Sequence, residues 1–350
     1  MRFLNYQYMG LFLGFFILSL GLGYATLNRY DPVAFDGLSD LVFYADIVRN
    51  GPVFFIDEPL SIRTRLLSPW VAHLFYIMLP SLGSWNTVSV ALLIGNSIFT
   101  ALSVVLIFDI TYHFFRDSNI ALISGFLFIT NFTVINLNLA GGVDAAYGFF
   151  FLVLYYALIN DKWTLLPVIM VLGCLTKEAF LPVASAFILF SLIYQMLSLG
   201  RLSVTKVVLF LVMVSTGAAT IITLNFLVYG TISLPWAMLS SANIYIEPSV
   251  FDFGVFAISV CVELLRFLLT LGLLVFLSLS SIRKFPQWFL AGNFGTVLMI
   301  VSLGTYMTMR GVDLSGADYA RFIFSPAALF LCSASAVTIS KLQMNFSKRN

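Results

Sequence analysis

Apolar runs long enough to cross a lipid bilayer recur along this chain, and they constrain its fold more than any other feature of the sequence. The first run, Tyr8–Leu27, is about 20 residues long, which is enough for an α-helix to span the hydrocarbon core of a membrane. Arg2 is the charged residue that precedes it, and no A-x-A cleavage sequence follows it. We therefore expect a membrane anchor here rather than a cleaved signal peptide.

The composition excludes soluble proteins as a class. The chain is 60% hydrophobic and 10% charged, whereas soluble domains carry about 25% charged residues. The net charge of +2 is near neutral and the basic residues are scattered, so we expect no nucleic-acid partner. The three cysteines lie far apart inside apolar runs, which predicts buried packing rather than a disulfide framework or a metal site.

The sequence predicts an all-α polytopic membrane protein of about ten transmembrane helices, which form a single integral membrane domain over residues 1–350. No loop is large enough for a soluble domain. Besides the first run, the candidate spans are 86–114, 118–139, 143–160, 163–176, 179–198, 205–229, 253–281, 287–309 and 321–341.

The distribution of charge predicts that both termini are cytosolic. With the N-terminus inside, ten of the eighteen Lys and Arg residues face the cytosol and six lie on the opposite side, together with twelve of the sixteen acids. An excess of Lys and Arg on the cytosolic side is the usual arrangement in a plasma or bacterial inner membrane. The long polar loops, at 28–65, 230–252 and 310–320, then share the extracytoplasmic face.

The first of these loops, at about 28–65, predicts a surface helix over 39–50. Ser39 is a suitable N-cap, Gly51-Pro52 ends the helix, and its broad apolar stripe favours a position along the membrane surface. The apolar segment 66–80 that follows the loop is too short to span, so we expect a second surface helix there. A plain alternative is that the first helix packs on the bundle and its acids are merely solvated.

Two motifs of this region resemble those of a known family. Asp40-x3-Tyr44-Ala-Asp46-Ile-Val is similar to the D-E-x-x-Y-A-E-I-A element that follows the first span in membrane glycosyltransferases of the GT-C fold, most closely the lipid A aminoarabinose transferases and the protein O-mannosyltransferases. Asp36-Gly37 with Arg63-x-Arg65-Leu-Leu-x-Pro69 resembles a pattern of smaller bacterial GT-C proteins that build surface glycans.

Two further segments extend the resemblance over most of the chain. Gly173-Cys-Leu-Thr-Lys177-Glu178 resembles the G-x-x-x-K-G/E segment at the end of the fifth span, and Asp318-Tyr-Ala-Arg321-Phe-x-x-Ser-Pro326 resembles the start of the last helices. The chain departs from the family in two respects. Leu41 stands where the family often has a second acid, and the large C-terminal extracytoplasmic domain of many members is missing.

The resemblance implies transfer of a sugar from a polyprenyl-phosphate carrier to a glycan, lipid or protein acceptor. Glycosyl transfer passes through an oxocarbenium-like state and needs a base for the incoming hydroxyl. Asp40 is the expected base and Asp36 its rival. Lys177, Arg63, Arg65 and Arg321 are expected near the leaving phosphate.

The remaining expected substrate contacts are Tyr44, Asp46, Asp144 and Glu178. No cofactor is required, although a divalent cation held by Asp36 and Asp40 would be compatible. The two histidines have no His or Cys at ligand spacing, which gives no support to another metal site.

Each site residue also has a structural alternative. Lys177 could be a snorkelling interfacial lysine, Arg63 and Arg65 could pair with Asp57 and Glu58, Arg321 could be an interfacial anchor at the start of the last span, and Asp144 could cap a helix. Two other functions stay open as well. The protein could be a lipid or solute transporter or flippase, or a non-catalytic scaffold subunit with a GT-C-like fold.

Overall fold

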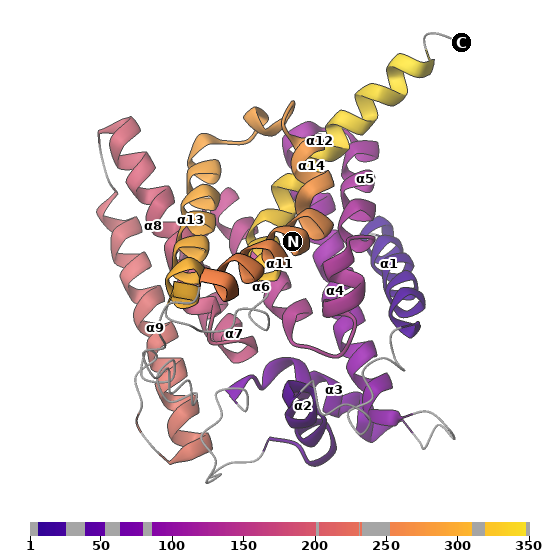
Figure 1. The fold of residues 1–350 in the computed structure, drawn as a ribbon, viewed down its shortest axis with the longest axis vertical. Helices are drawn as coiled ribbons and strands as arrows, with labels where there is room; N and C mark the ends of the chain where they lie inside the picture. Colours follow the sequence, from indigo (N-terminus) through magenta and orange to yellow (C-terminus); the bar gives the residue numbers. More distant parts are fainter. Residues whose placement is uncertain are drawn as a thin grey trace. The chain divides into compact units, whose positions relative to one another are not determined.

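The computed structural model describes residues 6–25, 39–52, 64–79, 86–200, 203–230, 232, 253–309 and 319–347. All regular secondary structure within these ranges is helical, and none of these residues lies in a β-strand (Figure 1). The prediction of an α-helical protein is therefore confirmed.

Within the described part of the chain, six helical segments are long and apolar enough to cross a membrane, which agrees with a multi-pass membrane protein. They are Tyr6–Tyr24 (α1), Thr87–Phe115 (α4), Phe180–Ser198 in α8, Val204–Tyr229 (α9), Val260–Ser278, and Ile323–Gln343 in α14. Shorter apolar helices lie at Leu67–Met78 (α3), Ser118–Ile129 (α5), Asp144–Ile159 (α6), Trp163–Thr176 and Gln287–Leu303. The total of ten spans remains a prediction.

Several predicted helix ends agree closely with the structure. The two predicted surface helices are α2, Ser39–Asn50, and α3, Leu67–Met78. The segment 287–309 is helix α13, Gln287–Met309. Helix α8 is Phe180–Leu199, and α14, Tyr319–Ser347, continues six residues beyond the predicted end at 341.

Two predicted spans are not uninterrupted α-helices. The segment 118–139 consists of α5 and a π-helical turn, η3, at Val134–Asn138. Between them the Asn131 side chain accepts a hydrogen bond from the backbone N–H of Thr133 (2.9 Å), so a new turn begins there. The segment 253–281 contains α11 (Phe253–Phe267), the π-helical turn η5 (Leu268–Gly272) and α12 (Leu273–Ser278).

The chain packs as two compact units. The first unit comprises residues 1–106, 129–181 and 211–242, and the second comprises 107–128, 182–210 and 243–350, described here within the ranges given above. Helices α4, α5, α8 and α9 each contribute residues to both units.

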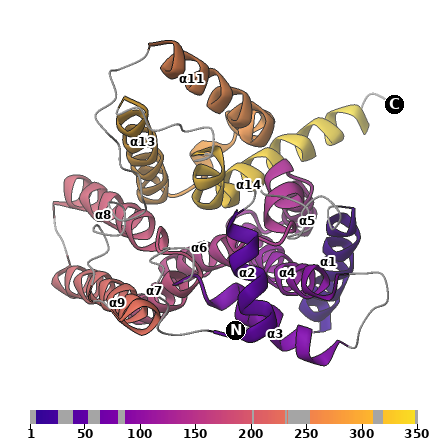
Figure 2. The same ribbon diagram turned by 60° about the horizontal axis from the view of Figure 1, so that its bottom comes forward.

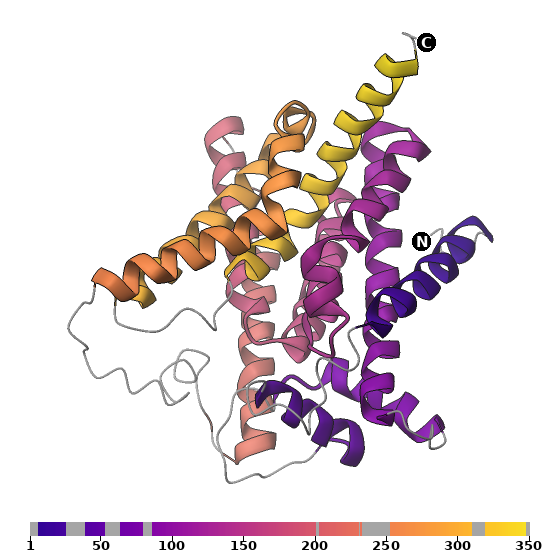
Figure 3. The same ribbon diagram turned by 45° about the vertical axis from the view of Figure 1, so that its right-hand side comes forward.

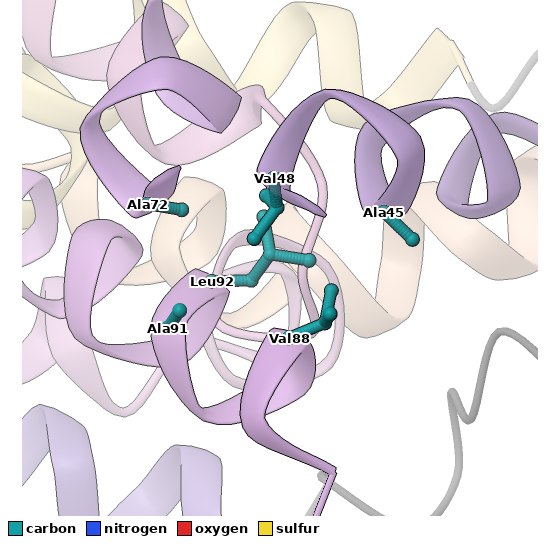
Figure 4. Close-up of a cluster of buried hydrophobic side chains, with 6 residues drawn as sticks. All are labelled: Ala45, Val48, Ala72, Val88, Ala91 and Leu92. Atoms are coloured by element: carbon teal, nitrogen blue, oxygen red, sulfur yellow. The ribbon is translucent and has the colours of Figure 1, made fainter. Parts of the chain in front are cut away.

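In the first unit, α2 and α3 pack on each other and on the beginning of α4 (Figure 2). The buried side chains at this junction are small or branched, which lets the helices approach closely. They are Ala45, Val48, Ala72, Val88, Ala91 and Leu92 (Figure 4). His73 Nδ1 of α3 also lies 2.8 Å from the Val48 carbonyl oxygen. Helix α2 is therefore fixed along its apolar face.

Helices α6 and α7 form the other part of the first unit that bears on the site. Helix α7, Leu166–Thr176, follows a short 3₁₀ turn at Trp163–Leu165 and packs along α6. The rings of Phe151 and Phe180 lie 4.7 Å apart, and Tyr147 packs against both. This aromatic cluster lies next to the charged residues described below.

In the second unit, α14 runs beside α12 and α13 (Figure 3). Ser335 of α14 donates a hydrogen bond to the Leu274 carbonyl of α12 (2.9 Å), and the hydroxyls of Ser333 and Thr111 lie 2.6 Å apart. These two contacts give buried hydroxyls of the second unit a hydrogen-bond partner where apolar surroundings exclude water.

Candidate functional site: a cluster of buried ion pairs

The first ion pair of the site joins Arg65 to Glu178. Arg65 precedes α3, and Glu178 lies in the turn between α7 and α8. Arg65 Nε donates to Glu178 Oε2 (2.9 Å) and Nη2 donates to Oε1 (2.6 Å), which is the two-pronged geometry that makes arginine–carboxylate pairs strong and directional. Arg65 Nη1 also donates to the hydroxyl of Tyr44 (3.1 Å), a residue of α2 that is 2% exposed.

The second ion pair joins Lys177 to Asp144 and is more deeply buried. Lys177 Nζ lies 3.1 Å from Asp144 Oδ1, and the two side chains are 4% and 5% exposed. The ammonium also lies 5.7 Å from the centre of the Tyr147 ring, within the range of a cation–π interaction. An isolated charge at such a position would be very unfavourable, so each partner depends on the other.

The backbone at the end of α7 explains how neighbouring residues enter two different pairs. Helix α7 ends at Thr176, and Lys177 is extended (φ −164°, ψ 129°). Successive side chains of an extended backbone point to opposite sides, so Lys177 and Glu178 diverge. The Phe180 N–H then bonds to the Lys177 carbonyl (2.9 Å), which fixes the turn before α8.

The loop before α6 is shaped by a glycine and held by α4. Gly141 has φ +103°, and a Cβ there would lie 3.1 Å from a side-chain carbon of Leu41 in α2; a side chain would be strained in this conformation. The Asn96 amide of α4 donates to the Gly142 carbonyl (2.9 Å) and accepts from the Ser68 hydroxyl (3.0 Å).

Electrostatic coupling shifts the pKa values of Arg65 and Glu178 in opposite directions. Burial opposes ionisation of Glu178, but the charge of Arg65 and its hydrogen bonds outweigh that effect and hold the pKa of Glu178 below the ordinary 4.5. Burial likewise opposes the charge of Arg65, but Glu178 and Tyr44 raise its pKa well above the ordinary value. Both groups are therefore charged at neutral pH.

The structure brings together five of the ten residues that the sequence predicts for the site. They are Tyr44, Arg65, Asp144, Lys177 and Glu178, from four separate segments of the first unit. Sequence reasoning missed Tyr147, Asn96 and Ser68. The polar Asn96-Ser97 pair inside an apolar run was an available signal, because an amide in a span needs a partner.

Of the other five predicted residues, one has a described side-chain contact, two have a described backbone alone, and two lie outside the described residues. Asp46, half-buried on α2, accepts a hydrogen bond from the exposed Asn50 amide (2.7 Å). Asp40 lies in the first turn of α2 and Arg321 in the first turn of α14, but their side chains lie outside the described part of the structure. Asp36 and Arg63 lie outside the described residues altogether.

Two structural alternatives are wrong, and the described contacts do not test the other two. Lys177 is buried rather than snorkelling to an interface. Asp144 is not the N-cap of α6, because Val143 occupies that position. Arg65 pairs with Glu178, whereas Asp57 and Glu58, its partners in the structural alternative, lie outside the described residues.

The divalent-cation hypothesis is not tested by these contacts. Among the residues that the structure describes, no three or more His, Cys, Asp or Glu side chains form a group that could hold a metal ion. Asp36 and the Asp40 side chain, which carry the hypothesis, fall outside that part. The four charged residues of the cluster pair two cations with two carboxylates, so their formal charges cancel.

Comparison with known proteins found no relative of this chain. No protein-family model, no curated protein sequence and no solved structure matches the chain. Function therefore has to be argued from the site.

Proposed function

We propose that this protein is a membrane glycosyltransferase that moves a sugar from a polyprenyl-phosphate carrier to an acceptor on the extracytoplasmic face. The observation that carries the proposal is the contact of Tyr44 with the Arg65–Glu178 pair. It joins the helix that bears Asp40 to the turn that bears Lys177. These are the segments whose motifs resemble those of GT-C enzymes.

Asp40 is the proposed base. It lies one helical turn before Tyr44 in α2, so the hydrogen bond from Arg65 to Tyr44 restrains the part of the helix to which Asp40 belongs. A fixed backbone position matters because a base acts only within hydrogen-bonding reach of the proton that it removes. In this proposal Tyr44 is a positioning residue, and Arg65 positions α2 through Tyr44 in addition to its proposed contact with the donor phosphate.

The proposed reaction is a substitution at the anomeric carbon of the donor sugar. The acceptor oxygen forms a bond to that carbon, the bond from the carbon to the phosphate oxygen breaks, and the polyprenyl phosphate leaves with the electron pair. The acceptor proton passes to the Asp40 carboxylate, which also offsets positive charge on the sugar ring.

The leaving phosphate requires cationic donors close by. Arg65 and Lys177 are the described candidates, and both already contact carboxylates. In this proposal the phosphate therefore shares these cations with Glu178 and Asp144 rather than meeting bare charges. The shared cations favour binding of the donor phosphate. When no substrate is bound, the carboxylates keep these cations paired.

The test uses purified protein in lipid nanodiscs and a panel of polyprenyl-phosphate sugars, with released polyprenyl phosphate as the readout and a mixture of peptide, lipid and glycan acceptors. Asp40→Asn should abolish release without lowering thermal stability. Asp161→Asn is the matched control, since Asp161 is exposed and has φ +53°, a conformation that asparagine tolerates.

Each outcome of this test bears on a different function. Release that survives Asp40→Asn would make Asp36 the base. Donor binding without any release would favour a scaffold subunit, and movement of the lipid across the bilayer without release would favour a flippase.

Tyr44→Phe should slow release with little change in donor affinity, because it loosens the position of the base rather than the binding of the donor.

A further inference from the structure

Three hydroxyl groups meet at the surface of the second unit, where α12 turns into α13. The Ser280 and Thr338 hydroxyls lie 2.8 Å apart, and the Ser281 hydroxyl lies 3.3 Å from Ser280 and 3.4 Å from Thr338. Ser281 is buried and Ser280 is exposed. The hydroxyl cluster therefore reaches from the interior to the surface.

Three exposed cations lie within four residues in sequence of a member of this hydroxyl cluster. Arg283 and Lys284 belong to the short 3₁₀ turn η6, Ile282–Lys284. Lys341 lies one helical turn after Thr338 in α14, and residues at that spacing share a face of a helix. Helices α12, α13 and α14 and the turn contain no acidic residue.

The turn that carries these groups is held in place by aromatic packing. Phe285 is buried, and the centre of its ring lies 5.3 Å from the ring centre of Phe114 and 5.7 Å from that of Phe115. Lys284 Nζ lies 5.6 Å from the centre of the Phe115 ring. Asp117, two residues after Phe115, accepts hydrogen bonds from the N–H groups of Asn119 and Ile120 in the first turn of α5. The cations are therefore presented on a rigid turn, which reduces the entropy lost on binding.

We propose that Ser280 and Thr338, together with Arg283, Lys284 and Lys341, bind the phosphate group of an anionic phospholipid, while the buried Ser281 hydroxyl supports the other two hydroxyls from beneath. Hydroxyl and cationic donors in one cluster suit phosphate oxygens, which accept charge-assisted hydrogen bonds. A lipid fits better than a soluble anion because large apolar side chains next to the cluster are exposed, among them Phe276, Leu279 and Leu342. These side chains can contact the acyl chains while the cluster holds the headgroup.

This proposal does not depend on the sugar-transfer proposal, because none of its residues belongs to the ion-pair cluster. It also differs from the general preference of membrane proteins for cations on one side. That preference needs charge alone, whereas the proposed site needs the hydroxyls as well.

The experiment measures lipid retained by the full-length protein in detergent micelles, by native mass spectrometry, with phosphatidylglycerol and phosphatidylcholine of identical acyl chains. Lys284→Gln should weaken phosphatidylglycerol retention about fivefold, the usual effect of one cation near a headgroup. Thr338→Val, which removes a hydroxyl at constant volume, should weaken it about tenfold.

Lys162→Gln is the matched control for charge. Lys162 is also exposed and lies 5.9 Å from the centre of an aromatic ring, that of Tyr156, but it belongs to the first unit. Its replacement should leave retention unchanged. Ser280→Ala, at an exposed position, provides a second hydroxyl variant should Thr338→Val lower the unfolding temperature.

The expected result is a preference for phosphatidylglycerol that Lys284→Gln and the hydroxyl variants weaken and that millimolar inorganic phosphate does not displace. Equal retention of both lipids would overturn the proposal. So would equal losses in Lys284→Gln and Lys162→Gln, since diffuse surface charge would then be sufficient. Unchanged retention in both hydroxyl variants, or displacement by inorganic phosphate, would overturn it as well.

Discussion

Arg65 and Glu178 are 113 residues apart in sequence, yet their side chains meet through two hydrogen bonds of 2.9 and 2.6 Å. The pair joins the segment before α3 to the turn between α7 and α8. Through Tyr44 it also holds α2. One arginine thus connects three segments of the first unit, which makes it the structural centre of the proposed site.

Removing one partner of this pair should destabilise the protein more than removing both. Arg65→Met leaves the Glu178 carboxylate without its guanidinium partner. We expect a loss of about 2–3 kcal/mol, somewhat below the range for fully buried pairs because Glu178 is 25% exposed. Arg65→Met/Glu178→Leu should recover at least half of that loss. The free energy of unfolding in nanodiscs measures the loss in each variant. A loss in the double variant equal to the sum of the losses in the two single variants would contradict the coupling.

The pH dependence of stability should report the lowered pKa of Glu178. A carboxyl group whose pKa is lower in the folded state stabilises that state at all pH values above its unfolded pKa, and the contribution disappears as the pH falls through the folded pKa. The stability difference between wild type and Glu178→Gln should therefore stay constant from pH 7 to about 5 and shrink at lower pH.

The control for this titration is the same pair of proteins compared at high salt. A partly buried ion pair is screened by salt less than surface charges are. Most of the stability difference between wild type and Glu178→Gln at neutral pH should therefore persist at high salt. A difference that already shrinks near pH 6 would mean that the pKa of Glu178 is raised, which contradicts the predicted direction.

Several features of the fold could be predicted because local chemistry determines them. Helix α2 begins at Ser39 and ends before Gly51-Pro52 in both the prediction and the structure. The break near Asn131 was missed because the surrounding residues are almost all apolar. Hydropathy therefore stays high through a turn that one amide side chain initiates.

The site was only partly predictable, for a different reason. Motifs identified Arg65, Lys177 and Glu178 individually, and Asp144 was expected as a substrate contact, but the partners of each depend on how distant segments pack. Lys177 and Glu178 are adjacent in sequence and suggest a local pair. The extended backbone at Lys177 directs them instead to Asp144 and Arg65.

Lys177→Met should be among the most destabilising substitutions at the site. It leaves Asp144, which is 5% exposed, without its ammonium partner, and breaking a buried pair in this way costs about 3–5 kcal/mol. Lys177→Met/Asp144→Leu should restore much of the stability, as judged by the unfolding temperature in nanodiscs. A mild effect of the single substitution would mean that Asp144 is readily neutralised or hydrated.

Gly173→Ala should disturb the aromatic support of the same ion pair. A Cβ at Gly173 would lie 2.2 Å from the Phe180 ring, and that ring is packed against Phe151 and Tyr147. We expect a loss of about 1–3 kcal/mol. Gly14→Ala is the control, because a Cβ there meets nothing within 4 Å and alanine favours a helix. Equal effects of the two substitutions would contradict the packing argument.

The most direct test of the central claim is the single-turnover release of polyprenyl phosphate by wild type and by Asp40→Asn in nanodiscs, with the donor prebound and the acceptor added at time zero. The account predicts release by wild type and a rate lower by a factor of about 10²–10⁴ in the variant, with equal donor affinity and equal unfolding temperature. Equal rates in the two proteins would contradict the assignment of Asp40. No release by wild type with any donor of the panel would contradict the transferase itself.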